Sequence, residues 1–166
     1  MSDSLNRQIE TVAKQLAECL RDQNKTLAVA ESCTGGWVAK ALTDLAGSSE
    51  WFNGGIVSYT NVAKQTLLNV DEASLITFGA VSEQVAIQMA EGALNAFDSS
   101  ISVAITGVAG PSGGTVDKPV GMVCFAAMMA LKEPISRTKI FSGNREKVRQ
   151  QAVLMAIQML LQVLAE

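Results

Sequence analysis

The chain contains no histidine, only three prolines and three cysteines, and few charged side chains. Without imidazole, the sequence excludes every catalytic triad built on histidine, and it lacks the commonest metal ligand. The three cysteines are odd in number and far apart, so they indicate neither a disulfide framework nor a zinc site. We therefore expect no metal, no cofactor and a reducing environment.

Charge is scarce as well: 17% of the residues are charged, against about 25% in an average protein. The net charge is −3 and lysines and arginines form no cluster, which argues against nucleic acid or an anionic membrane as a partner. The longest strongly apolar run, residues 119–131, is shorter than the ~20 residues of a membrane span. The first residues do not follow the basic-then-apolar order of a signal peptide. We expect a cytoplasmic protein that binds a small molecule and, because charge is so low, forms a homodimer.

The length of 166 residues suits a single domain, residues 1–166. Apolar residues at helical spacing predict helices over about 4–22 and 36–45, and after three N-cap residues, Asn61, Ser82 and Asn144. Short apolar runs predict strands over 26–30, 55–59, 101–105, 120–128 and 135–141, the last two joined by a turn at 132–134. This alternation predicts an α/β fold with a mixed sheet covered by helices, and three glycine- and serine-rich turns gathered at one end of the sheet.

Lysine is the natural candidate for a general base in a chain without imidazole, because partial burial lowers the pKa of its amine. Lys64 lies in the first turn of the predicted helix after Asn61, and a Ser–Lys pair is a known catalytic arrangement. Two serines compete as its partner: Ser32, between a strand and a helix, and Ser49, in an irregular stretch. Each serine equally suits a helix N-cap, and Lys64 equally suits a solvated surface, so the residues alone leave this choice open.

Two turns have the composition of anion-binding sites. Ser32, Thr34, Gly35 and Gly36 combine hydroxyls and glycines with helix-start amides. The glycine-rich loop over residues 106–114 has the same character. Neither contains a Walker A motif or a dinucleotide fingerprint.

Four further side chains near these turns have possible roles. Glu31 could orient a lysine or bind a ribose hydroxyl, and Tyr59, the only tyrosine, could stack on a ligand ring. Arg145 could offer two donors to a phosphate. Cys33, at a predicted helix start, is an alternative nucleophile if its thiolate is favoured there.

Several motifs follow one another in a recognisable order: Ala30-Glu31-Ser32-Cys33-Thr34-Gly35-Gly36, Ala46-Gly47-Ser48-Ser49, Phe52-Asn53-Gly54-Gly55, Tyr59-Thr60-Asn61 with Lys64, Gly79-Ala80-Val81-Ser82, Thr106-Gly107-Val108-Ala109-Gly110-Pro111 and Lys118-Pro119-Val120-Gly121. Over nearly the whole chain this set resembles the CinA C-terminal domain family, in particular its stand-alone amidase members. The resemblance implies hydrolysis of the carboxamide of nicotinamide mononucleotide to nicotinate mononucleotide and ammonia, in the salvage of pyridine nucleotides, by a Ser/Lys mechanism.

The resemblance also implies roles for individual residues. Lys64 becomes the general base, and we favour Ser49 over Ser32 as the nucleophile, because Ser32 belongs to the better anion-binding turn. Tyr59 is expected to position Lys64 or the pyridine ring. The residues expected to bind the nucleotide are Glu31, Thr34, Gly35, Gly36, Thr106, Gly107, Gly110 and Arg145. A non-catalytic mononucleotide-binding or regulatory module, connected with competence or DNA damage, is the alternative.

Overall fold

Five strands pair into one mixed sheet in the order β2-β1-β3-β4-β5. The computed structural model describes residues 2–166, with side chains from residue 4 onward. The strands are β1 (Leu27–Glu31), β2 (Phe52–Val57), β3 (Ile101–Gly107), β4 (Met122–Met129) and β5 (Ile135–Ile140). β1 pairs in parallel with β2 and β3, whereas β4 and β5 are antiparallel. The expected single-domain α/β fold with a mixed sheet is confirmed.

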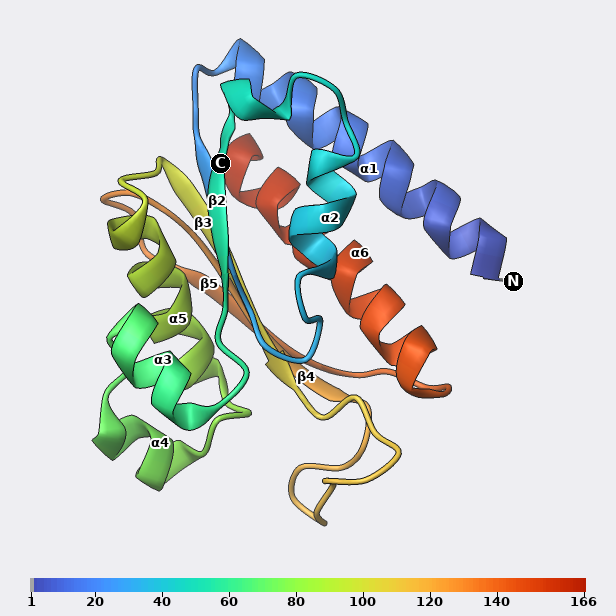
Figure 1. Cartoon of the computed structure of the whole chain (residues 1–166), viewed down its shortest axis with the longest axis vertical. Coiled ribbons are helices and arrows are strands. Elements are labelled where there is room, and N and C mark those ends of the chain that lie inside the picture. Colours follow the sequence, from blue (N-terminus) through green and yellow to red (C-terminus); the bar gives the residue numbers. More distant parts are fainter. Residues whose placement is uncertain (1) are drawn as a thin grey trace.

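Helices cover both faces of this sheet (Figure 1). One face packs against α1 (Ser2–Asp22), α2 (Trp37–Thr43) and α6 (Arg145–Ala165), and the other against α3 (Asn61–Leu68), α4 (Glu72–Phe78) and α5 (Glu83–Ala96). Side chains alternate along the strands, so that Val29 and Phe125 join the first core while Ala30 and Ala126 join the second. The two cores hold the sheet rigid between them.

Close backbone contact fixes α3, the helix that carries Lys64, against α5. A Cβ atom built on Gly92 of α5 would lie 2.1 Å from the carbonyl oxygen of Leu68, the last residue of α3. Only glycine permits that approach. Thr60 caps α3 by accepting a hydrogen bond from the Ala63 amide at 3.1 Å, and the backbone amide of Lys64 donates to the Thr60 carbonyl. Lys64 is therefore held on a well-anchored helix.

The predicted caps and boundaries are partly right. Ser82 and Asn144 cap α5 and α6 as expected, but the cap of α3 is Thr60 and not Asn61. The predicted strand at 55–59 is wrong in its bounds, since β2 begins at Phe52 and ends before the turn into α3. Gly54 obscures this start because its missing Cβ makes room for the ring of Phe97, 2.3 Å from where that Cβ would lie. The short helix α4 has no counterpart among the predicted elements.

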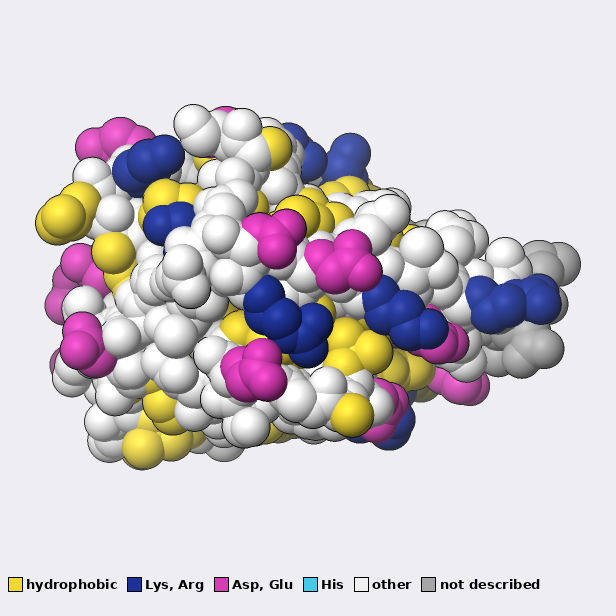
Figure 2. Space-filling model, turned by 90° about the horizontal axis from the view of Figure 1, so that it is seen from above, with side chains coloured by type: hydrophobic (Ala, Val, Ile, Leu, Met, Phe, Trp, Pro, Cys, Tyr) yellow, Lys and Arg dark blue, Asp and Glu magenta, His cyan; other side chains and the backbone are white. Residues whose placement is uncertain are grey.

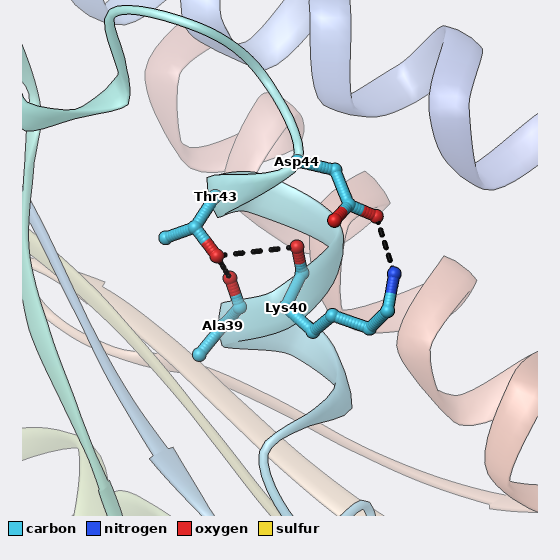
Figure 3. A network of polar contacts seen from close by, with 4 residues as sticks. All are labelled: Ala39, Lys40, Thr43 and Asp44. Carbon is cyan, nitrogen blue, oxygen red and sulfur yellow. Dashed lines mark hydrogen bonds and ion pairs between the residues drawn. The ribbon is translucent and has the colours of Figure 1, made fainter.

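The outer surface of α2 is held by local contacts. Lys40 and Asp44 form an ion pair at 2.6 Å, and the Thr43 hydroxyl donates to the carbonyl oxygens of Ala39 and Lys40 (Figure 3). Both charged side chains are more than half exposed, so this pair contributes little to stability.

The helix α6 is the one helix of the described chain with the length and mean hydropathy of a membrane span. More than half of the window that passes this test is buried inside the protein, where α6 packs on α1, β3 and β4. That burial identifies α6 as a core helix.

Candidate active site

Chain connectivity changes direction between β1 and β3. The connection from β1 through α2 leads to β2 on one side, and the connection from β2 through α3, α4 and α5 returns to β3 on the other side. Loops diverge at such a switch point and leave a crevice at the carboxyl ends of the strands, where α/β proteins bind ligands. In Figure 1 this is the lower end of the sheet, beside the long loop between β3 and β4.

A pocket of about 260 Å³ occupies this crevice. Its walls come from the turn after β1, the turn from β2 into α3, the turn before α5, the loop after β3 and the first residue of α6. The lining residues are Ser32, Cys33, Tyr59, Asn61, Lys64, Ala80, Val81, Thr106, Gly107, Val108, Ala109, Gly110, Ser112, Gly113 and Arg145. They include two cations and no carboxylate, so the pocket suits an anionic ligand.

Lys64 and Ser32 meet inside this pocket. Nζ of Lys64 lies 3.0 Å from Oγ of Ser32 and donates to the carbonyl oxygen of Ser58 at 2.7 Å. The Lys64 residue is only 1% exposed and Ser32 only 8%. Burial lowers the pKa of Lys64 from its ordinary 10.5 to about 8, although the nearby Cys33 thiol acts in the opposite direction. A lysine amine with that pKa can serve as a proton acceptor near neutral pH.

The expectation that Ser49 lies beside Lys64 is wrong. Ser49 is exposed in the turn η1 (Ser48–Glu50), which precedes β2, whereas Ser32 follows β1. Because β1 and β2 are parallel, with Leu27 opposite Phe52, the two serines lie at opposite ends of the sheet, separated by roughly 16 Å of strand rise. Figure 2 shows the molecule from the end where β1 and β2 begin, a face on which acidic and basic side chains are interspersed.

The expected gathering of three glycine- and serine-rich turns is therefore only partly right. The turn after Glu31 and the loop over 106–114 both line or border the pocket. The stretch around Gly47 lies with η1 at the far end.

The turn after β1 does not present its helix-start amides to a ligand. The Glu31 carboxylate, 1% exposed, accepts hydrogen bonds from the backbone amides of Gly36, Val38 and Ala39 at 3.1, 3.1 and 2.9 Å. The chain thus supplies its own anion at the start of α2, which contradicts the predicted anion-binding role of this turn.

Four of the predicted binding residues consequently lie outside the pocket wall. Glu31 caps α2 instead of facing the pocket, and Thr34, Gly35 and Gly36 line a separate hollow on the other side of the turn. Oγ1 of Thr34 is buried with no hydrogen-bond partner within the described chain.

The remaining predicted residues do come together. Thr106 is buried and its hydroxyl donates to the Ala80 carbonyl at 2.8 Å, while Gly107 and Gly110 form the wall beside it. Arg145 donates to the carbonyl oxygen of Gly110 at 2.7 Å and to the hydroxyl of Tyr59 at 2.9 Å. Tyr59 itself is 58% exposed, so Tyr59 and Arg145 form the rim of the pocket.

Cys33 is not equipped to act as the nucleophile. Burial raises the pKa of its thiol from the ordinary 9.0 to about 12, outweighing the favourable contribution of its backbone amide. The thiol therefore stays protonated near neutral pH, and the helix-start argument for a reactive thiolate fails because desolvation is the larger effect.

Sequence reasoning missed Arg149. From α6, its Nε donates to the Cys33 carbonyl and one terminal nitrogen donates to the Thr34 carbonyl, both at 3.0 Å. Its guanidinium also lies 5.4 Å from the ring centroid of Trp37. No local pattern marks an arginine in the second turn of a helix as a partner of a turn more than a hundred residues away.

The amino-acid sequence is similar to that of known proteins over nearly its whole length. The CinA C-terminal domain family matches residues 9–164, and the chain belongs to this family. It is 48% identical over 162 residues to the nicotinamide-nucleotide amidohydrolase PncC of Escherichia coli K12, covering 98% of this chain and 96% of that protein. A CinA-like protein of Mycolicibacterium gilvum is 50% identical over 141 residues, which are 85% of this chain but 33% of the relative.

Solved structures of similar proteins have the same fold as this chain. A competence/damage-inducible protein from Agrobacterium tumefaciens superposes with a TM-score of 0.92 at 40% identity, covering 96% of both chains. A CinA superfamily protein from Escherichia coli superposes with a TM-score of 0.90 at 38% identity, over 93% of this chain and 90% of that one.

Proposed function

We propose that this protein is a nicotinamide-nucleotide amidohydrolase in which Ser32 is the nucleophile and Lys64 the general base. The observation that carries the proposal is the contact between the buried Lys64 amine and the Ser32 hydroxyl, in a chain that has no histidine. The relatives named as PncC amidohydrolases, which match nearly the whole chain, support the reaction class.

The geometry around Lys64 suits proton transfer in both directions. Nζ donates one hydrogen to the Ser58 carbonyl, which fixes the amine and, once it is neutral, leaves its lone pair for the Ser32 hydroxyl proton. The resulting alkoxide attacks the carboxamide carbon of nicotinamide mononucleotide. Lys64 then passes the proton to the departing nitrogen, and ammonia leaves as the acyl-enzyme ester forms.

Hydrolysis of the ester reverses the proton path. Lys64 takes a proton from the attacking water, the ester bond to Ser32 breaks, and the proton returns to the serine oxygen. The product is nicotinate mononucleotide. Because Lys64 handles every proton in this scheme, we expect ammonia release to continue in the presence of a chelator.

The rim and the cationic lining suit the rest of the substrate. We assign the phosphate or ribose contacts to Arg145, Thr106 and the backbone at Gly107 and Gly110, and a contact with the pyridine ring to Tyr59. We further propose that the enzyme acts in pyridine-nucleotide salvage in the cytoplasm. We also propose that it forms a homodimer, because the low content of charged residues suits a protein that buries part of its surface against a second copy.

The decisive experiment measures ammonia release from nicotinamide mononucleotide by Ser32→Ala and its matched control Ser49→Ala. We expect Ser32→Ala to lose about 10⁴-fold or more in kcat while still binding the nucleotide in calorimetry. Ser49→Ala is expected to stay within about twofold of the parent protein, because exposed sites away from the chemistry have small effects. The opposite ranking would return the nucleophile to Ser49. Tight nucleotide binding with no turnover by the parent protein would favour the non-catalytic binding module.

A further inference from the structure

The backbone after Ser32 is held from outside the pocket. The carbonyl oxygens of Cys33 and Thr34 both accept hydrogen bonds from Arg149, and the Ser32 carbonyl accepts one from the Gly35 amide. Ser32 and Cys33 line the pocket, whereas Thr34 and Arg149 line the hollow on the opposite side of the turn. Arg149 therefore hydrogen-bonds to the backbone of this turn on the side that faces away from the pocket.

Most amides of this turn are already used. The amide of Ser32 donates to Ile105, that of Gly35 to Ser32 and that of Trp37 to Thr34, and three others donate to the Glu31 carboxylate. Over residues 32–39 of the described chain, only the amides of Cys33 and Thr34 donate to no other residue. They directly follow the proposed nucleophile, where acyl-transfer enzymes need donors for a developing oxyanion.

Peptide geometry connects these two observations. In a planar trans peptide the carbonyl and the next amide point in opposite directions. Because Arg149 binds the Cys33 carbonyl on one side of the turn, the Thr34 amide points to the opposite side. Thr34 itself is buried, and on that side Ser32 and Cys33 line the pocket. Rotation of that peptide would place a carbonyl oxygen where a donor is required.

We propose that Arg149 is a positioning residue that holds the Cys33–Thr34 peptide so that the Thr34 amide, with that of Cys33, stabilises the oxyanion formed on attack by Ser32. This inference rests on the proposed amidohydrolase function, and it adds a residue of α6 that does not line the pocket. The guanidinium has the two donors needed for both carbonyls, and the face of Trp37 restricts its orientation. A lysine at this position would keep the charge but not the forked geometry.

The test compares Arg149→Lys and Arg149→Gln with Arg137→Lys. Arg137 is a matched control, since its guanidinium also hydrogen-bonds across elements, to Gln162, but far from this turn. We expect both Arg149 variants to lose roughly 10- to 100-fold in kcat for nicotinamide mononucleotide, with KM within about threefold of the parent value. The amides that Arg149 positions would stabilise the oxyanion and not the bound substrate. Arg137→Lys should keep the parent kcat. Thermal unfolding of all three variants verifies that they are folded at the assay temperature.

A second assay does not depend on the nucleotide. A small fluorophosphonate forms a bond between phosphorus and the Ser32 oxygen, fluoride leaves, and Lys64 accepts the proton; mass spectrometry follows the labelled peptide. Labelling should slow in the Arg149 variants by a factor similar to their loss in kcat. A parent protein that labels at Ser32 but releases no ammonia would refute the proposed substrate while leaving the role of Arg149 open to this assay. Folded Arg149 variants with the parent labelling rate, or a parent protein with neither reaction, would overturn the inference.

Discussion

Replacing Lys64 by methionine should change how the free energy of unfolding depends on pH, because the pKa of Lys64 is lowered in the folded protein. In the folded protein the pKa of Lys64 is about 8, against 10.5 for an ordinary lysine, so between these pH values the unfolded chain binds more protons than the folded one. Raising the pH through this window therefore stabilises the fold, and the stabilisation is lost as the pH falls towards 8. At about 1.4 kcal/mol per pH unit, the buried lysine costs up to about 3 kcal/mol at pH 7 and about 1 kcal/mol at pH 10.

The measurement is urea unfolding of the parent protein and Lys64→Met at pH 7 and pH 10, followed by tryptophan fluorescence. Removing the amine also leaves the Ser58 carbonyl without its donor, but that cost does not change with pH. The parent protein should therefore gain about 2–3 kcal/mol on the variant between pH 7 and pH 10. Other titrating groups are common to both proteins and cancel in the difference. Stability differences that are equal at the two pH values would refute the assignment of a lowered pKa to Lys64.

Three further outcomes follow from the geometry. Because Lys64 must be neutral to accept a proton, kcat/KM from ammonia release should rise about tenfold per pH unit below pH 8 and level off above it; a flat profile from pH 6 to pH 8 contradicts this. Glu31→Gln removes the charge that binds three amides at the start of α2 and should cost about 2–3 kcal/mol of unfolding free energy in urea; an unchanged value would show that the carboxylate is not needed there. Gly92→Ala, normally stabilising in a helix by about 1 kcal/mol, should instead lower the free energy of unfolding by about 1–3 kcal/mol because its methyl group meets the Leu68 carbonyl, and a rise in Tm would refute that contact.

The sequence singles out Lys64, which the structure places in the pocket, but it does not identify the serine that lies beside it, and the reason is physical. The absence of histidine leaves few candidates for proton transfer, and Lys64 follows a strand, where α/β proteins bind ligands. The same rule distinguishes the two serines. In parallel strands, a residue that follows one strand cannot lie beside a residue that precedes the next. Ser32 follows β1 and Ser49 precedes β2, so applying strand direction to both serines would have selected Ser32.

Other parts of the site depend on contacts that no local pattern encodes. Glycines and hydroxyls after Glu31 indicate an anion-binding turn, and the turn does bind an anion, but the anion is the carboxylate of Glu31 itself. The partnership of Arg149 with the Cys33 and Thr34 carbonyls requires α6 to pack beside that turn. The sheet and most of its helices could be predicted from hydrophobic periodicity and helix caps alone. These side-chain contacts could not, because they depend on the tertiary fold.

Net charge and site charge differ in this protein, and the difference bears on substrate choice. The chain carries −3 overall, yet the described pocket wall contains Lys64 and Arg145 and no acidic side chain. Glu31, the carboxylate nearest in sequence to Ser32, is turned away into the start of α2, where it accepts hydrogen bonds from three backbone amides. An additional free carboxylate in the pocket would raise the pKa of Lys64 and repel a phosphate. Burying Glu31 under α2 therefore serves both steps of the proposed chemistry, because no carboxylate in the pocket wall raises the pKa of Lys64 or repels an anionic nucleotide.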